Sequence, residues 1–177
     1  MSLSDLASIG SFVSGVAVLI SLIYLALQVR QAERNQKAIL QQGRATRNAD
    51  TVLRIAEPGI VEAFRKARTG DVTLSALELE QFILCTRALM YGMEDVFFQH
   101  RNHLLDDAAF DSTVNALRFN MSAPGYRAAW KAMRGVHEPS FRDFVDQIVR
   151  EAAVAPPVDR LAQWTADVSA EQAAKAG

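Results

Sequence analysis

The stretch from Ile9 to Val29 constrains the fold most, because it holds twenty-one consecutive residues of which none is charged. An α-helix rises about 1.5 Å per residue, so this run extends for about 30 Å, the thickness of the hydrocarbon core of a bilayer. A helix also satisfies its own backbone hydrogen bonds, which a membrane interior requires. The sequence therefore predicts one N-terminal transmembrane helix.

Two other interpretations of this run fit less well. A cleaved signal peptide has a basic N-terminal region, a shorter apolar stretch and a small-residue cleavage site. Here the charged side chain before the run is Asp5, and Gln28, Val29 and Arg30 follow it without a cleavage pattern. A buried core helix of a soluble domain is disfavoured by the length of the run and by its abrupt basic flank.

Charge is distributed unevenly on either side of the run. Residues 30–54 carry six bases and two acids, whereas residues 55–177 carry thirteen bases and seventeen acids. Basic residues beside a span stay in the cytoplasm, so the N-terminus is expected outside and the body inside. A basic collar beside an acidic body does not resemble a nucleic-acid-binding surface, which needs a domain-wide basic stripe. Three collar residues are expected at anionic lipid headgroups, unless they only set topology: Arg30, Arg34 and Lys37.

One face of the predicted helix carries small and uncharged residues at alternating spacings of four and three. Transmembrane helices associate through close backbone approach at small residues and through polar side chains that pair across the interface. The heptad spacing predicts a self-association seam along the span and the segment that follows it. A stalk packed on its own soluble domain is the alternative. The seam consists of Gly10, Ser14, Ala17, Ser21, Tyr24, Gln28, Gln31, Asn35 and Ala38, and it continues to Gln42, Ala45 and Ala49.

The rest of the chain favours an all-α fold. It is rich in Ala, Leu, Arg and Glu, and no stretch alternates convincingly enough to predict a strand. We expect a transmembrane anchor at residues 1–30, a basic helical stalk at 31–57, a helical bundle at 58–155 and a C-terminal helix or tail at 156–177. The anchor and stalk are expected to form one helix from about Leu3 to about Ile55.

Turn and capping residues divide the body into helices. Ser75 and Glu78 have the spacing of a capping box, and Pro139 stands where a first-turn proline is favoured. The expected helices are Ile60–Arg68, a helix capped by Thr73 or Ser75 and reaching Asn102, one capped by Asp106 or Asp107 and reaching Met121, one starting at Pro124, Ser140–Ala153, and Val158–Lys175 after a Pro156–Pro157 break. The expected buried residues are Leu79, Phe82, Ile83, Leu89, Met90, Met93, Val96 and Phe97, then Tyr126, Trp130 and Met133, then Phe141, Phe144, Val145, Ile148 and Val149.

The densest group of possible metal ligands runs from Glu94 to Asp107. Two ligands on one helix must be three or four residues apart to share a face. His100 and His103 meet this condition if the helix extends that far, and His103 with Asp106 or Asp107 is the best mixed pair. The sequence has no Glu-x-x-His and no His-Glu-x-x-His pattern. A helix end followed by a helix cap explains the same residues without a metal.

No motif for catalysis or cofactor binding is present. Cys85 lies in an apolar run without a neighbouring acid or base, which is typical of an inert buried thiol. The chain has no nucleophile elbow, P-loop or dinucleotide fingerprint. The larger aromatic residues are expected in the core rather than around a ligand: Tyr91, Tyr126, Trp130 and Trp164.

The segment Leu19–Gln31, with the sequence LISLIYLALQVRQ, resembles the span signature of a group of uncharacterised bacterial proteins. Those proteins combine a single N-terminal span with a small helical domain, and Tyr91–Phe110 and Pro124–Trp130 are also similar to them. The resemblance implies a bacterial inner-membrane (plasma-membrane) protein and no particular reaction. Many members have glycine where His103 stands, which argues against catalysis by that residue.

These observations predict a membrane-anchored scaffold or interaction protein that self-associates through its span and stalk and is not an enzyme. The alternative is a membrane-tethered sensor that binds a small molecule or a metal at the His100–Asp107 turn. A small enzyme is a third possibility, for which no motif was found.

Overall fold

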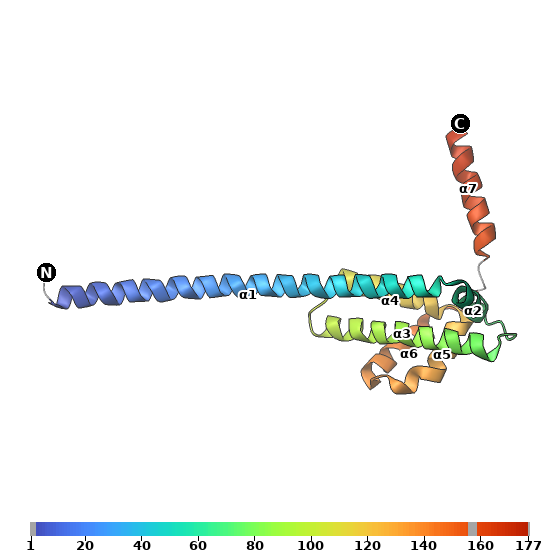
Figure 1. Ribbon diagram of the computed structural model, residues 1–177, viewed down its shortest axis with the longest axis horizontal. Coiled ribbons are helices and arrows are strands. Elements are labelled where there is room, and N and C mark those ends of the chain that lie inside the picture. The colour runs from blue at the N-terminus through green and yellow to red at the C-terminus, as the bar shows by residue number, and fades with distance from the viewer. Residues whose placement is uncertain (1–2, 156–158, 177) are drawn as a thin grey trace. The chain divides into compact units, whose positions relative to one another are not determined.

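The computed structural model describes residues 3–155 and 159–176, which form seven α-helices and no strand. Of the described residues, 87% are helical, so the predicted all-α fold is confirmed. The chain divides into two compact units, residues 1–50 and residues 51–177. The helices (Figure 1) are α1 (Leu3–Ile55), α2 (Pro58–Thr69), α3 (Ala76–Arg101), α4 (Asp107–Met121), α5 (Pro124–Met133), α6 (Pro139–Glu151) and α7 (Arg160–Ala176), with a short 3₁₀ turn η1 (Arg134–Val136).

Helix α1 is unbroken over 53 residues, with the limits expected from the sequence. No proline precedes Pro58 in the chain, so every interior residue can donate its backbone hydrogen bond. Pro58 follows the end of this helix and is also the first residue of the next one. Glu57 is extended, as a residue before proline prefers to be, and Pro58 opens α2 two residues before the expected start at Ile60.

Side-chain caps fix the starts of three body helices. Ser75 and Glu78 form the predicted capping box at α3. Asp106, rather than Asp107, caps α4 by accepting a 2.9 Å hydrogen bond from the Ala109 backbone N–H. The third cap, at α6, is Glu138, which accepts from the backbone of Ser140 and Phe141. Each cap satisfies amide groups that have no partner within the helix.

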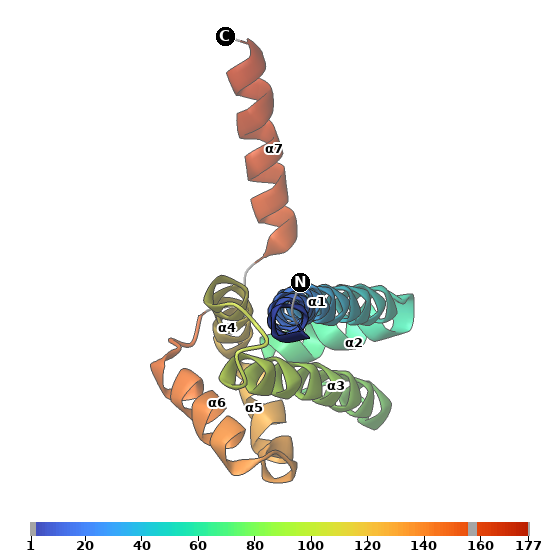
Figure 2. The same ribbon diagram turned by 90° about the vertical axis from the view of Figure 1, so that its left-hand side faces the viewer.

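The core of the body lies between α2, α3, α4, α5 and α6, which pack together as a bundle (Figure 2). The Phe82 ring of α3 makes T-shaped contacts with Phe64 of α2, at 5.0 Å between ring centroids, and with Tyr126 of α5, at 5.4 Å. Most of the predicted core residues are buried or packed against the core. The prediction that Leu79 is buried was wrong, because its side chain is 48% exposed on α3. The fully buried large side chains include Phe82, Met90, Leu117, Met121, Trp130, Met133, Phe141 and Val145.

Helices α2 and α5 approach so closely at Gly125 that no side chain fits there. A Cβ atom on Gly125 would lie 1.8 Å from the Ala67 carbonyl oxygen, far inside van der Waals contact. Ala67 is itself buried. Two small residues therefore set the distance between these helices.

The end of α6 and the exposure of two aromatic residues depart from expectation. Helix α6 ends at Glu151 rather than Ala153, where the Arg127 guanidinium donates to the carbonyls of Val149 and Ala152. Trp164 on α7 is 68% exposed and Tyr91 is 49% exposed, so the prediction that these two aromatics belong to the core was wrong. The predicted Pro156–Pro157 break and Val158, the expected start of the last helix, lie outside the described residues.

Candidate functional site

The N-terminal helix exposes apolar side chains that water does not favour. One helix in the described part of the chain is long and apolar enough to cross a membrane, and no residue of its most apolar window is buried. Phe12 is 73% exposed and Ile20 is 61% exposed. Soluble proteins rarely leave continuous apolar surface of this kind uncovered. The exposure distinguishes this helix from the core helix of a soluble protein, which would be mostly buried.

All nine residues of the predicted seam, from Gly10 to Ala38, are exposed on α1. Nothing lies within 4 Å of a Cβ atom placed on Gly10, so another helix has room to approach there. The Ser21 hydroxyl donates a 2.9 Å hydrogen bond to the Ala17 carbonyl of its own helix. The seam is therefore accessible, and one of its hydroxyl groups already has a partner within the chain.

The three predicted lipid-contacting cations, Arg30, Arg34 and Lys37, are also exposed. Successive helix residues are rotated by about 100°, so positions 30, 34 and 37 fall within an arc of about 60°. Glu33 lies at the edge of the same face. These three cations thus form one cationic face, beside the seam rather than on it.

The predicted metal candidates do not form a ligand set. His103 lies beyond the end of α3 at Arg101, so it does not share a helix face with His100. His100 instead stacks on Phe110, at 3.9 Å between ring centroids, and its Nε2 lies 2.9 Å from a carboxylate oxygen of Asp107. The Asp106 carboxylate is occupied as the α4 cap. Among the described residues, no group of three or more His, Cys, Asp or Glu side chains could hold a metal ion.

His103 occupies a position set by backbone geometry. Its φ of 58° is left-handed, the conformation that glycine adopts most readily. The His103 N–H donates to the His100 carbonyl and the Leu104 N–H to the Gln99 carbonyl, which together form a Schellman motif closing α3. The residue therefore terminates a helix.

A pair formed by the buried His137 and Glu94, which no sequence pattern predicted, joins α3 to the start of α6. The His137 side chain is fully buried, and its Nδ1 lies 2.9 Å from a carboxylate oxygen of Glu94. The other Glu94 oxygen accepts a 2.8 Å hydrogen bond from the Glu138 backbone N–H. The rings of Tyr91, Trp130 and Phe141 surround the imidazole, with centroids 5.3 to 5.4 Å away.

This arrangement orients His137 but gives no reactant access to it. The Glu94 carboxylate accepts hydrogen bonds, so Nδ1 of His137 is the donor in this contact. Nε2 is buried and has no hydrogen-bond partner among the described residues. The segment before α6 engages both Glu94 oxygens, so the pair links α3 to the start of α6. Its partners are 43 residues apart, and no local pattern in the sequence joins them.

A second polar cluster ties α5 to α6. The Asp146 carboxylate accepts a 2.8 Å hydrogen bond from the Trp130 indole N–H and pairs with the Arg134 guanidinium. The hydrogen bond from Arg134 holds the pKa of Asp146 below its ordinary value, although partial burial opposes this. Trp130 thereby satisfies its one polar atom while its ring fills the core.

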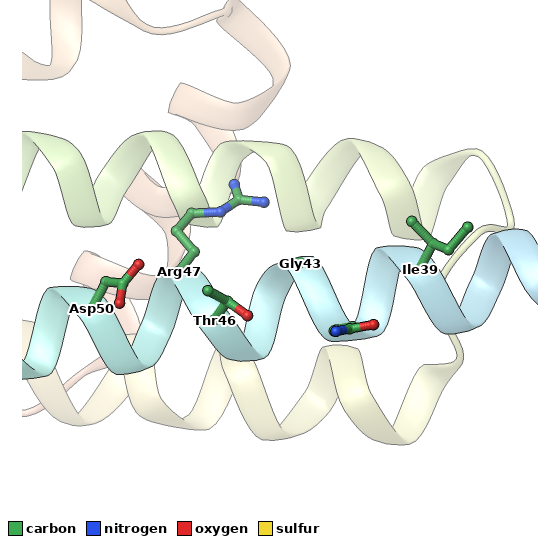
Figure 3. Close-up of a pocket in the computed structure, with 6 residues that line it drawn as sticks. Ile39, Gly43, Thr46, Arg47 and Asp50 are labelled. Carbon is green, nitrogen blue, oxygen red and sulfur yellow. The ribbon is translucent and has the colours of Figure 1, made fainter.

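Two hollows on the surface of the described residues are open. One runs along α1 and is lined by residues of that single helix (Figure 3), including Ile39, Gly43 and Asp50. Another lies where the C-terminal ends of α4 and α6 meet, beside Phe119 and Ala152. Small-molecule sites are usually concave and enclose most of the ligand. Neither hollow has that form.

Cys85 is partly buried, and its burial raises the pKa of its thiol above the ordinary value. A thiol with a raised pKa is a poor nucleophile at neutral pH. The environment of Cys85 thus favours the inert thiol expected from the sequence.

The chain matches no protein-family model, no curated protein and no solved structure.

Proposed function

We propose that the protein is a membrane-anchored helical scaffold that self-associates through α1. Its N-terminus faces outward, and its helical body lies in the cytoplasm beside the inner membrane. The observation that carries this proposal is the uncovered apolar surface of α1 at residues 10–29. Lipid covers such a surface without needing polar partners, because the helix backbone is already hydrogen-bonded.

The orientation is proposed from charge. Residues 30–54 have an excess of four positive charges, whereas Asp5 is the charged side chain that precedes the span. The positive-inside rule then retains the collar and the body in the cytoplasm.

Membrane fractionation and protease access test the tether and its orientation. The full chain should sediment with membranes and resist extraction at alkaline pH. Protease should digest the body in inverted vesicles and leave it intact in whole cells. A chain found in the soluble fraction would refute the tether, and a body digested from outside would reverse the orientation.

Self-association is proposed from the exposed seam and from the polar side chains it carries within the span, such as Tyr24 and Gln28. A polar group facing lipid gains from a partner on another helix, by roughly 0.6 kcal/mol on average. No contact between copies is required to fold the body, because its core is complete within one chain.

Disulfide crosslinking tests the seam. In a chain with Cys85→Ala, we expect Ser14→Cys and Ala38→Cys to give covalent dimers or larger species in membranes. The matched controls are Val16→Cys and Leu40→Cys, two residues further along and about 200° around the helix. Equal crosslinking of seam and control positions, or none at either seam position, would show that the seam is not an interface.

A further inference from the structure

We propose that the face of α1 formed by Arg30, Arg34 and Lys37 is a binding site for anionic lipid headgroups. This inference rests on the membrane tether proposed above and specifies its lipid partner. It assigns the three cations a selective role beyond setting topology.

The first argument is placement along the helix. Arg30 directly follows the apolar run, and seven residues separate Arg30 from Lys37, a rise of about 10 Å. The headgroup layer on each side of a bilayer is about 5–8 Å thick. All three cations therefore lie at or just beyond the depth of lipid phosphates when the apolar run fills the hydrocarbon core. Arg44 and Arg47 begin about 20 Å beyond Arg30, further than the Debye length at physiological salt.

The second argument is clustering and availability. The three side chains share an arc of about 60° on the helix and are exposed. None of the ion pairs in the described part of the chain involves them. Glu33 on the same face lowers the local charge to a net +2, so the surface still matches an anion.

The third argument concerns compatibility with self-association. The centre of the cationic face lies about 100° around the helix from the centre of the seam residues Gln31, Asn35 and Ala38. Two helices paired along the seam would therefore leave their cationic faces turned toward lipid. The site is complete within one chain and does not depend on the oligomer.

Lipid retention by the purified full-length protein tests the inference. The chain is reconstituted in equal amounts of phosphatidylglycerol and phosphatidylcholine with matched acyl chains, and the lipids it retains are counted by native mass spectrometry. Each cation near an anionic surface is worth about fivefold in partition. We expect severalfold enrichment of phosphatidylglycerol in the wild type.

The decisive variant is Arg30→Gln/Arg34→Gln/Lys37→Gln, which should lose most of that enrichment. Its matched control is Arg44→Gln/Arg47→Gln/Arg54→Gln, which removes the same charge from the same helix further from the membrane. This control should retain the phosphatidylglycerol enrichment. Glu33→Gln removes a negative charge from this face and should increase the enrichment. Unchanged enrichment in the first variant, or equal loss in the control, would overturn the site.

Flotation of the same samples separates this inference from the tether. A chain that floats with vesicles but retains both lipids equally refutes the lipid site and leaves the tether standing. A chain that does not float refutes both.

Discussion

Residues 10–29 of α1 and the body helices α2–α6 treat their apolar side chains in opposite ways. On α1, large apolar residues such as Leu19 and Ile20 are more than half exposed. In the body, Trp130 and Phe82 are 2% exposed, within a core shared by five helices. The same residue types therefore meet different surroundings. The body buries them away from water, whereas under the proposed anchoring lipid covers the exposed surface of α1.

The difference extends to polar groups. In the body, the buried His137 and the partly buried Glu94 and Asp146 have hydrogen-bond partners on other elements of the fold. In the apolar half of α1, the Ser21 hydroxyl has a partner in its own helix. A partner in the same helix does not specify how that helix packs, whereas a partner on another element does.

Removing residues 1–50 should have the largest effect. We expect residues 51–177 to leave the membrane fraction completely and to keep a cooperative unfolding transition, because the body core involves no residue before Thr51. Membrane fractionation and circular dichroism measure the two outcomes. A truncated body that does not fold would break the contrast between the two units.

Gly125→Ala should destabilise the body by about 3 kcal/mol, because its Cβ would meet the Ala67 carbonyl oxygen at 1.8 Å. Denaturant unfolding measures the loss. The control is Gly92→Ala in α3, where nothing lies within 4 Å of the new Cβ. That variant should gain up to about 1 kcal/mol from helix propensity. Similar stabilities for the two variants would contradict the close approach of α2 and α5.

Glu94→Ala should cost about 2 kcal/mol, since it leaves His137 Nδ1 and the Glu138 backbone N–H without their acceptor. The matched control is Glu80→Ala, on an exposed part of the same helix, which should stay within about 0.5 kcal/mol of the wild type. The same unfolding measurement applies. Equal costs at both positions would mean that the buried pair does not join α3 to α6.

Glu78 should make a pH-dependent contribution to the stability of the body. The hydrogen bond from Lys66, together with those from Ser75, lowers its pKa from 4.5 to about 2. When folding lowers the pKa of a carboxyl group, the charged carboxylate stabilises the fold at pH values above its unfolded-state pKa. This stabilisation is lost as the pH falls from about 4.5 to about 2. The difference in denaturation midpoint between wild type and Glu78→Gln should therefore narrow between pH 6 and pH 2.5. A constant difference would exclude this ionisation as the cause.

His103→Gly should produce the smallest change, a gain of about 0.5 kcal/mol, because glycine adopts the left-handed conformation of this position without strain. His103→Ala keeps the strain and serves as the control, for which no gain is expected. Thermal unfolding measures both. A loss of stability in the glycine variant would return His103 to consideration as a functional side chain.

Local signals were sufficient for much of the fold. The charge-free run and the seam that continues past it predicted the length of α1, and the Ser75 and Glu78 spacing predicted the start of α3. Hydrophobic periodicity located most of the core but misplaced Leu79, because the apolar stripe of α3 is wider than the surface its neighbours cover. The exposed rings of Tyr91 and Trp164 were mispredicted for a similar reason: residue type indicates a preference for burial and not the presence of a covering element.

The sequence by itself determined the properties that depend on neighbouring residues: a charge-free run long enough for a bilayer, its basic flank, and most of the helix starts and ends. Tertiary structure alone decided what distant residues do together, namely the Glu94–His137 link, the Trp130–Asp146 hydrogen bond and the contact of Gly125 with Ala67. Periodicity and capping act over three or four residues along the chain, whereas these contacts join side chains or backbone 16 to 58 positions apart. Their geometry exists only once the helices have packed.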